Sequence, residues 1–128
     1  VQNSSIELEK IEFGSSINNS FKAKTSKFFS TNSSNNNLRL KILSVKFKKK
    51  NFYGGAAARA QQIEIIGELE YIFSNSVINK NGTLRTSSWI PVNEANPLSE
   101  IVAQKTIIEE LEFVLLEKLM EEYWSVEN

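Results

Sequence analysis

Apolar and polar residues alternate in the middle of the chain. Between Ile63 and Phe73, apolar side chains occupy nearly every second position, with Glu64, Glu68 and Glu70 between them. This spacing is typical of an antiparallel strand with one buried and one mostly water-facing side. We therefore expect a long, half-buried strand here.

Near the C-terminus the spacing becomes helical. No glycine or proline follows Pro97, and apolar residues recur at three- and four-residue steps, at Ile101, Ile108, Leu111, Leu115 and Leu119. The pattern predicts one long amphipathic helix. A second apolar stripe on it contains Phe113, Leu116, Met120 and Trp124. Packing against another helix of the chain explains this stripe, and contact with a partner protein or within an oligomer is the alternative.

The first thirty residues predict a strand followed by a helix. Apolar residues from Ile6 to Phe13 indicate the strand, but their parity changes after Leu8, which requires a bulge or a strand end. Residues 16–30 place most of their large apolar side chains near one helical face, so we expect an amphipathic helix with Ser15 or Ser16 as its N-cap. The Ser, Thr and Asn run at 31–37 predicts a loop.

Three further strands are expected to form a meander. Alternation from Leu38 to Phe47 changes phase near Ile42, which predicts a bulge. Residues 51–60 are rich in glycine and alanine and suit a hairpin tip. The next hairpin is expected at 77–82, with Asn81-Gly82 as its turn, and the last strand at 83–90.

These elements follow the order β-α-β-β-β-α and predict an α+β fold. We expect a single mixed or antiparallel sheet of about four strands with two helices packed on one face. Residues 1–128 are expected to form one domain, because no composition shift marks a boundary.

Composition narrows the possible functions. Fifteen basic residues balance fifteen acidic ones, and the chain has neither histidine nor cysteine. The usual general base, the commonest metal ligand and thiol chemistry are therefore absent, and we expect no enzyme, no cofactor and no metal site. The run Phe113–Leu116 is far shorter than the roughly 20 apolar residues that cross a bilayer.

Short motifs mark the successive elements: Asn37-Leu-Arg-Leu, Ala58-Arg-Ala, Tyr71, Arg85, Asn96-Pro-Leu and Ala103-Gln-Lys. In this order they resemble the LptE family of lipopolysaccharide-assembly lipoproteins, over residues 6–124. The resemblance implies a non-enzymatic protein that plugs the LptD outer-membrane β-barrel and assists lipopolysaccharide transport. It also implies a location at the outer membrane, on the periplasmic side, and a signal peptide and lipidated cysteine before Val1.

A basic cluster is the first candidate binding site. Lys46, Lys48, Lys49 and Lys50 lie close together in the sequence, and Arg59 is expected across the hairpin from them. Five positive charges on one rim suit the phosphates of lipopolysaccharide, because lysine tolerates varied geometry and arginine binds bidentately. The alternative is a solvated strand end whose charges prevent edge pairing.

A partner interface is predicted at Phe52, Tyr53, Gly54 and Gly55, which place two aromatic rings on the hairpin tip. The resemblance implies that this tip inserts into the barrel. Alternatively, both rings fold back onto the sheet.

A different function is also compatible with these residues. The lysine cluster, together with the rings of Phe52 and Tyr53, would suit a soluble binding module for nucleic acid or another anionic ligand. The balanced net charge argues against nucleic acid. The carboxylates of Glu64, Glu68 and Glu70 are expected to be solvated, so no catalytic residue is named.

Overall fold

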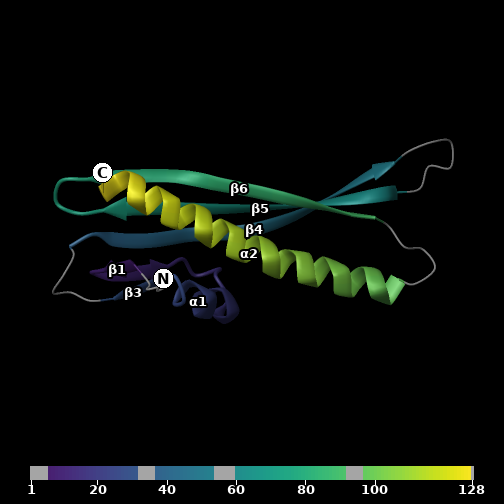
Figure 1. The fold of residues 1–128 in the computed structure, drawn as a ribbon, viewed down its shortest axis with the longest axis horizontal. Helices are drawn as coiled ribbons and strands as arrows, with labels where there is room; N and C mark the ends of the chain where they lie inside the picture. The colour runs from purple at the N-terminus through teal and green to yellow at the C-terminus, as the bar shows by residue number, and fades with distance from the viewer. Residues whose placement is uncertain (1–5, 32–36, 54–59, 92–96, 128) are drawn as a thin grey trace, which may run out of the picture.

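The computed structural model describes residues 6–31, 37–53, 60–91 and 97–127. Its elements are arranged in the order shown in Figure 1: β1 (Ile6–Leu8), β2 (Lys10–Phe13), α1 (Asn19–Thr25), β3 (Phe29–Thr31), β4 (Arg39–Tyr53), β5 (Ala60–Ser74), β6 (Asn79–Pro91) and α2 (Pro97–Glu127). The predicted α+β class is confirmed.

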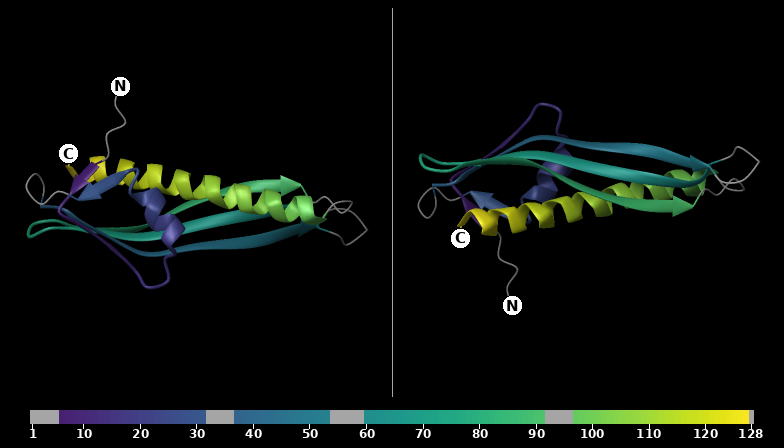
Figure 2. Two further views of the ribbon diagram at one scale, coloured as in Figure 1. Left: turned by 90° about the horizontal axis from the view of Figure 1, so that it is seen from below. Right: turned by 90° about the horizontal axis from the view of Figure 1, so that it is seen from above.

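A mixed four-stranded sheet forms one layer, in the order β2-β4-β5-β6. β2 pairs with β4 in parallel, whereas β4, β5 and β6 pair antiparallel as a meander. Figure 2 shows α2 running along one side of this sheet, with α1 on the same side. The predicted four strands and two helices on one face are therefore present.

The first predicted strand ends after Leu8, and the chain resumes as a separate strand. β1 pairs in parallel with β3 to form a small second sheet, while β2 joins the main sheet. The parity change after Leu8 marks this division, because β1 buries Ile6 and Leu8 whereas Ile11 and Phe13 of β2 are only partly buried.

The helix predicted for residues 16–30 is too long. α1 has seven residues and is capped by Asn18, whose Oδ1 accepts a hydrogen bond from the amide of Phe21 at 2.8 Å, so Ser15 and Ser16 are not the cap. The amide of Phe28 then donates to the carbonyl of Thr25 at 2.9 Å, a tight three-residue step that ends the helix. Phe29 consequently lies in β3 and not on a helical face.

The predicted bulge in the second long strand is confirmed. Ile42 is opposite Tyr71 of β5, but Ser44 is opposite Glu70, so Leu43 is the extra residue. An extra residue exchanges the two faces of a strand. Leu40 and Ile42 therefore face the core before the bulge, and the lysines after it alternate in the opposite phase.

The turn predicted at Asn81-Gly82 is wrong, because both residues lie inside β6. The hairpin turns at Asn75, whose Oδ1 accepts hydrogen bonds from the amides of Val77 at 2.7 Å and Ile78 at 2.6 Å. An asparagine side chain that binds the next backbone amides supplies a turn without glycine. Gly82 instead lies opposite Tyr71.

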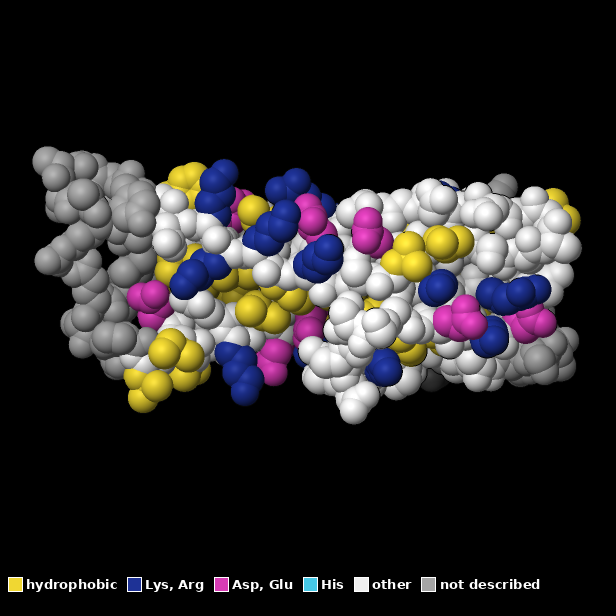
Figure 3. Space-filling view, turned by 180° about the vertical axis from the view of Figure 1, so that it is seen from behind, with side chains coloured by type: hydrophobic (Ala, Val, Ile, Leu, Met, Phe, Trp, Pro, Cys, Tyr) yellow, Lys and Arg dark blue, Asp and Glu magenta, His cyan; other side chains and the backbone are white. Residues whose placement is uncertain are grey.

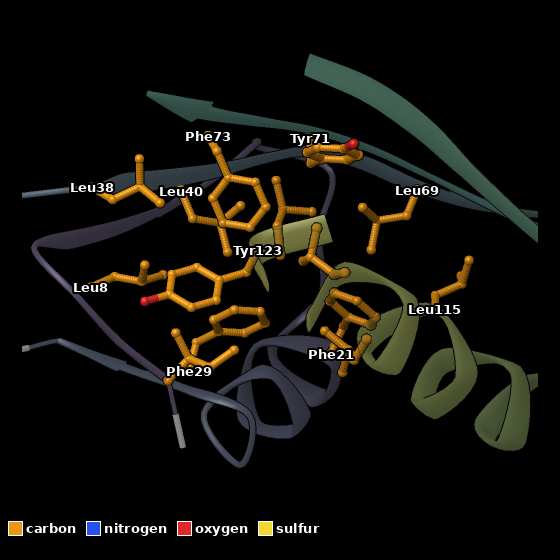
Figure 4. Close-up of a cluster of buried hydrophobic side chains, with 14 of the residues drawn as sticks. Leu8, Phe21, Phe29, Leu38, Leu40, Leu69, Tyr71, Phe73, Leu115 and Tyr123 are labelled. Carbon is orange, nitrogen blue, oxygen red and sulfur yellow. The ribbon is translucent and has the colours of Figure 1, made fainter. Parts of the chain in front are cut away.

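The main hydrophobic core fills the space between the sheet and the two helices. Figure 4 shows ten of its labelled side chains converging from both sheets and both helices, namely Leu8, Phe21, Phe29, Leu38, Leu40, Leu69, Tyr71, Phe73, Leu115 and Tyr123. A smaller core contains Ile63, Ile65, Ile90 and Leu111. Phe47 packs against both cores and connects them.

The second apolar stripe of α2 is only partly covered by other parts of the chain. Leu116 is fully buried, and the ring of Phe113 lies 6.1 Å from that of Phe28, just beyond the end of α1. Trp124 is 53% exposed, and Ile101 of the main stripe is 63% exposed. Packing within the chain thus explains the centre of this stripe, whereas Trp124 and Ile101 remain largely exposed.

Candidate functional site

The candidate site is built on the second half of β4, where strand geometry separates the lysines. Lys46, Lys48 and Lys50 occupy alternate positions, and all four lysines of the cluster are exposed. Successive side chains of a strand point to opposite faces. Lys49 is opposite Ile65, a residue of the helix-covered face, so it does not share a face with the other three.

Acidic side chains lie directly opposite two of the three lysines of the outer face. Lys46 is opposite Glu68 and Lys50 is opposite Glu64 on β5. Residues directly opposite each other on antiparallel strands share a face and interact. The expectation that Glu64, Glu68 and Glu70 are merely solvated therefore needs a correction for Glu68, which has basic neighbours.

Glu68 is the centre of a small ionic network. Its carboxylate lies 4.0 Å from Nζ of Lys48 and 3.7 Å from Nη1 of Arg85, which is opposite it on β6. On the same strand as Glu68, the carboxylate of Glu70 accepts a hydrogen bond from the hydroxyl of Ser44 at 2.8 Å. Figure 3 shows the back of the molecule, where basic and acidic side chains lie side by side without a large region of one sign.

Arg85 was not predicted as a site residue, although the sequence contains a signal for it. In β6 it lies on the exposed face that carries Thr83 and Ser87, whereas the positions between them are partly covered. Its meeting with Glu68 depends on the register of β5 and β6, which only the structure shows. Arg59, the fifth charge of the predicted rim, lies outside the described residues, so its place beside the lysines stays a prediction.

Phe52 belongs to β4 and packs on the outer face of the sheet. Its ring centroid lies 4.7 Å from that of Trp89 on β6, so the two rings meet over β5, the strand between them. Nζ of Lys50 lies 5.2 Å from the centroid of Phe52. The ring of Phe52 therefore lies on the sheet, and its role in a partner interface stays a prediction. The side chain of Tyr53, and Gly54 and Gly55, lie outside the described residues.

A second polar group lies at the opposite end of the sheet. The hydroxyl of Tyr71 donates to Glu122 of α2 at 3.0 Å, and Nζ of Lys80 lies 2.9 Å from the same carboxylate oxygen. Hydrogen bonding from Lys80, and then from Tyr71, lowers the pKa of Glu122 against the opposing effect of burial. Burial, followed by the hydrogen bond to Glu122, raises the pKa of Tyr71 to about 12. This group joins the sheet to the helix.

An ion pair between Lys24 of α1 and Glu112 of α2 lies beside an open hollow of about 350 Å³. The two side chains are only 15% and 8% exposed. Ile101 and Ile108 of α2 add apolar surface to the hollow, and Lys105 and Glu109 add charge of both signs. The mixed lining favours no single class of ligand.

Groups that could hold a metal ion are absent from the described parts of the chain. No helix there is long and apolar enough to cross a membrane. Chemically, the outer face of β4 to β6 offers exposed cations, paired carboxylates and two aromatic rings in contact, which suit binding.

No family model and no curated protein matches the chain. Solved structures do share its fold. Rare lipoprotein B from Shewanella oneidensis superposes with a TM-score of 0.78 at 8% identity, covering 94% of this chain and 96% of that chain. An uncharacterized lipoprotein B from Nitrosomonas europaea has a TM-score of 0.68 at 9% identity, covering 93% and 85%. A minor lipoprotein from Acinetobacter baumannii has a TM-score of 0.54 at 10% identity, covering 94% of each chain.

Proposed function

We propose that this chain is the folded domain of an outer-membrane lipoprotein, located on the periplasmic side, that assists a lipopolysaccharide-transport barrel. The single observation that carries the proposal is the fold, because it matches solved lipoprotein structures across more than nine-tenths of the chain. The order of sequence motifs, which resembles the LptE family, points the same way.

The proposed partner is an LptD-like outer-membrane β-barrel, in which this domain acts as a plug. Its elongated shape, with the long helix lying along a three-stranded meander, suits insertion into a lumen (Figure 2). Exposed apolar side chains at the start of α2, at Leu98, Ile101 and Val102, provide surface for a protein contact. The proposed role is binding, without catalysis.

The experiment that tests this role is co-purification of the full-length protein, with its own leader, from its native outer membrane. A large β-barrel present in equal amounts supports the plug. A monomer recovered in the soluble fraction refutes it and favours a soluble module for an anionic ligand.

Direct binding of lipopolysaccharide is the second part of the proposal. Lys46, Lys48, Lys49, Lys50 and Arg59 supply the positive charge that its phosphates require. Glutamine in place of all five should weaken lipopolysaccharide binding and flatten its dependence on salt. A control variant carries glutamine in place of four exposed lysines elsewhere in the chain, namely Lys22, Lys27, Lys41 and Lys105. Equal binding by both variants would remove the basic cluster from the proposal.

A further inference from the structure

Along its second half, β4 has one edge that no strand of the described residues pairs with. β2 pairs with β4 only from Arg39 to Ile42, and along the rest of its length β4 pairs with β5 alone among the described strands. Figure 1 shows β4 continuing well beyond β2 and α1. A strand edge of this kind presents free backbone donors and acceptors, which an additional strand can pair with.

Gly14 ends the pairing with β2 at a defined point. Its amide donates to the carbonyl of Ile42 at 2.8 Å, and a Cβ on Gly14 would lie 2.2 Å from the carbonyl oxygen of Leu43. This close approach at the bulge requires glycine. The carbonyl of Gly14 then accepts from the amide of Ile17 at 3.2 Å, which turns the chain toward α1. None of the described strands therefore covers the edge from Ser44 to Phe52.

Four lysines lie close together along this edge of β4, with the carboxylates of Glu64 and Glu68 on the inner side, on β5. Lys46, Lys48, Lys49 and Lys50 are all exposed, and among the described residues only Lys48 has an ion-pair partner, at 4.0 Å. The other free edge of the sheet, on β6, differs in this respect. Its Lys80 and Arg85 are both ion-paired, to Glu122 and Glu68. Of these two edges, within the described residues, only the β4 edge carries lysines without an ion-pair partner.

Charge decides which strand this edge accepts. Antiparallel pairing of two copies through this edge would bring lysines against lysines, and like charges directly opposite each other are destabilising. An acidic strand would instead place carboxylates beside Lys46, Lys48 and Lys50, which repeat at every second position. The lysines therefore disfavour self-association and select an acidic partner.

We infer that the β4 edge from Ser44 to Phe52 is a docking site for an extended acidic segment of another protein, which adds a strand beside β4. Main-chain hydrogen bonds hold the segment, and acidic side chains at alternate positions provide specificity. The inference is independent of the proposed role at the outer membrane, because it requires only a partner with such a segment.

The test uses the whole 128-residue chain and a synthetic peptide of about ten residues, the upper length of a typical strand, in which glutamate alternates with valine or threonine. We expect binding, together with slower hydrogen exchange at backbone amides between Lys46 and Phe52. A peptide with glutamine for glutamate should bind about tenfold more weakly. A peptide N-methylated at alternate residues keeps its charge but loses backbone donors, so it should not bind.

Two protein variants separate this edge from general electrostatics. Glutamine at Lys46, Lys48 and Lys50 should weaken peptide binding about tenfold. Glutamine at Lys22, Lys27 and Lys105, which lie elsewhere, should leave binding unchanged. Equal binding of the methylated and unmethylated peptides would overturn strand addition in favour of a polyanion surface of the kind that lipopolysaccharide or nucleic acid would use. A dimer that forms through this edge without peptide would also overturn it.

Discussion

Tyr71 connects three elements through a single side chain. Its hydroxyl binds Glu122 of α2, and its ring is opposite Gly82 of β6. The Asn81-Gly82 pair indicates a turn when the sequence is taken alone, because asparagine followed by glycine is the strongest short hairpin signal. The structure uses this glycine for a different purpose, which is space for the ring.

Replacing Gly82 with alanine should destabilise the protein by about 1–3 kcal/mol, the usual effect of overpacking. A Cβ at this position would lie 2.9 Å from the hydroxyl oxygen and 3.3 Å from Cζ of Tyr71. Urea unfolding measures the change, and Ser87→Ala on the exposed face of β6 is the control. A stability equal to that of the control would show that the ring moves without loss.

Glu122 should make stability depend on acidity. Its pKa is lowered in the folded state, so its stabilising contribution is present above the ordinary value of 4.5 and is lost as the pH falls through the lower folded value. Glu122→Gln should therefore destabilise the protein at neutral pH and change it much less at about pH 3. Urea unfolding at both pH values measures the difference. A constant difference would assign the effect to packing.

At the scale of elements, the long periodic segments were predictable and the short ones were not. β5 and α2 show clear periods of two and about 3.6 residues, and the phase change marks the bulge at Leu43. β3 has three residues and exists because β1 pairs with it, a distant contact that leaves no periodic signal. At the site, the alternation of a strand is enough to place Lys49 on the other face from Lys48 and Lys50. The pairing of Glu68 with Arg85, in contrast, depends on the register between β5 and β6.

The short helix α1 depends on its contact with α2. The ion pair between Lys24 and Glu112 is largely buried, so removal of one partner leaves the other charge uncompensated. Lys24→Met should cost about 3–5 kcal/mol, whereas Lys24→Met with Glu112→Leu should return to within about 1 kcal/mol of the native protein. Urea unfolding of the Lys24→Met, Glu112→Leu and double variants gives the free energies of unfolding that a double-mutant cycle needs. Equal losses in the single and double variants would contradict this account.

At the scale of the whole molecule, the protein has a thick end and a thin end. The main core lies where both sheets and both helices meet, while the smaller core at the other end lies between the meander and α2 alone. A region with fewer buried contacts opens more easily than the rest. The two ends should therefore differ in local stability.

Amide hydrogen exchange should reveal this difference within a single strand. In β5, amides near Leu69 and Phe73 should exchange more slowly than those near Ile63 and Ile65, by about tenfold or more, because they lie over the main core. NMR-detected exchange at neutral pH measures both groups at once. Uniform protection along β5 would indicate that the two cores open together.

The two tryptophans lie at opposite ends of the molecule and can serve as intrinsic fluorescence probes of each end. Trp89 packs against Phe52 at the thin end, and Trp124 lies in the last turn of α2 at the thick end, where its ring meets that of Tyr123. The chain has no other tryptophan. A variant that keeps only Trp89 would report by its fluorescence on events beside the β4 edge, and one that keeps only Trp124 on events at the helix end. The two variants together would thus report on each end of the molecule separately, by intrinsic fluorescence and without an added label.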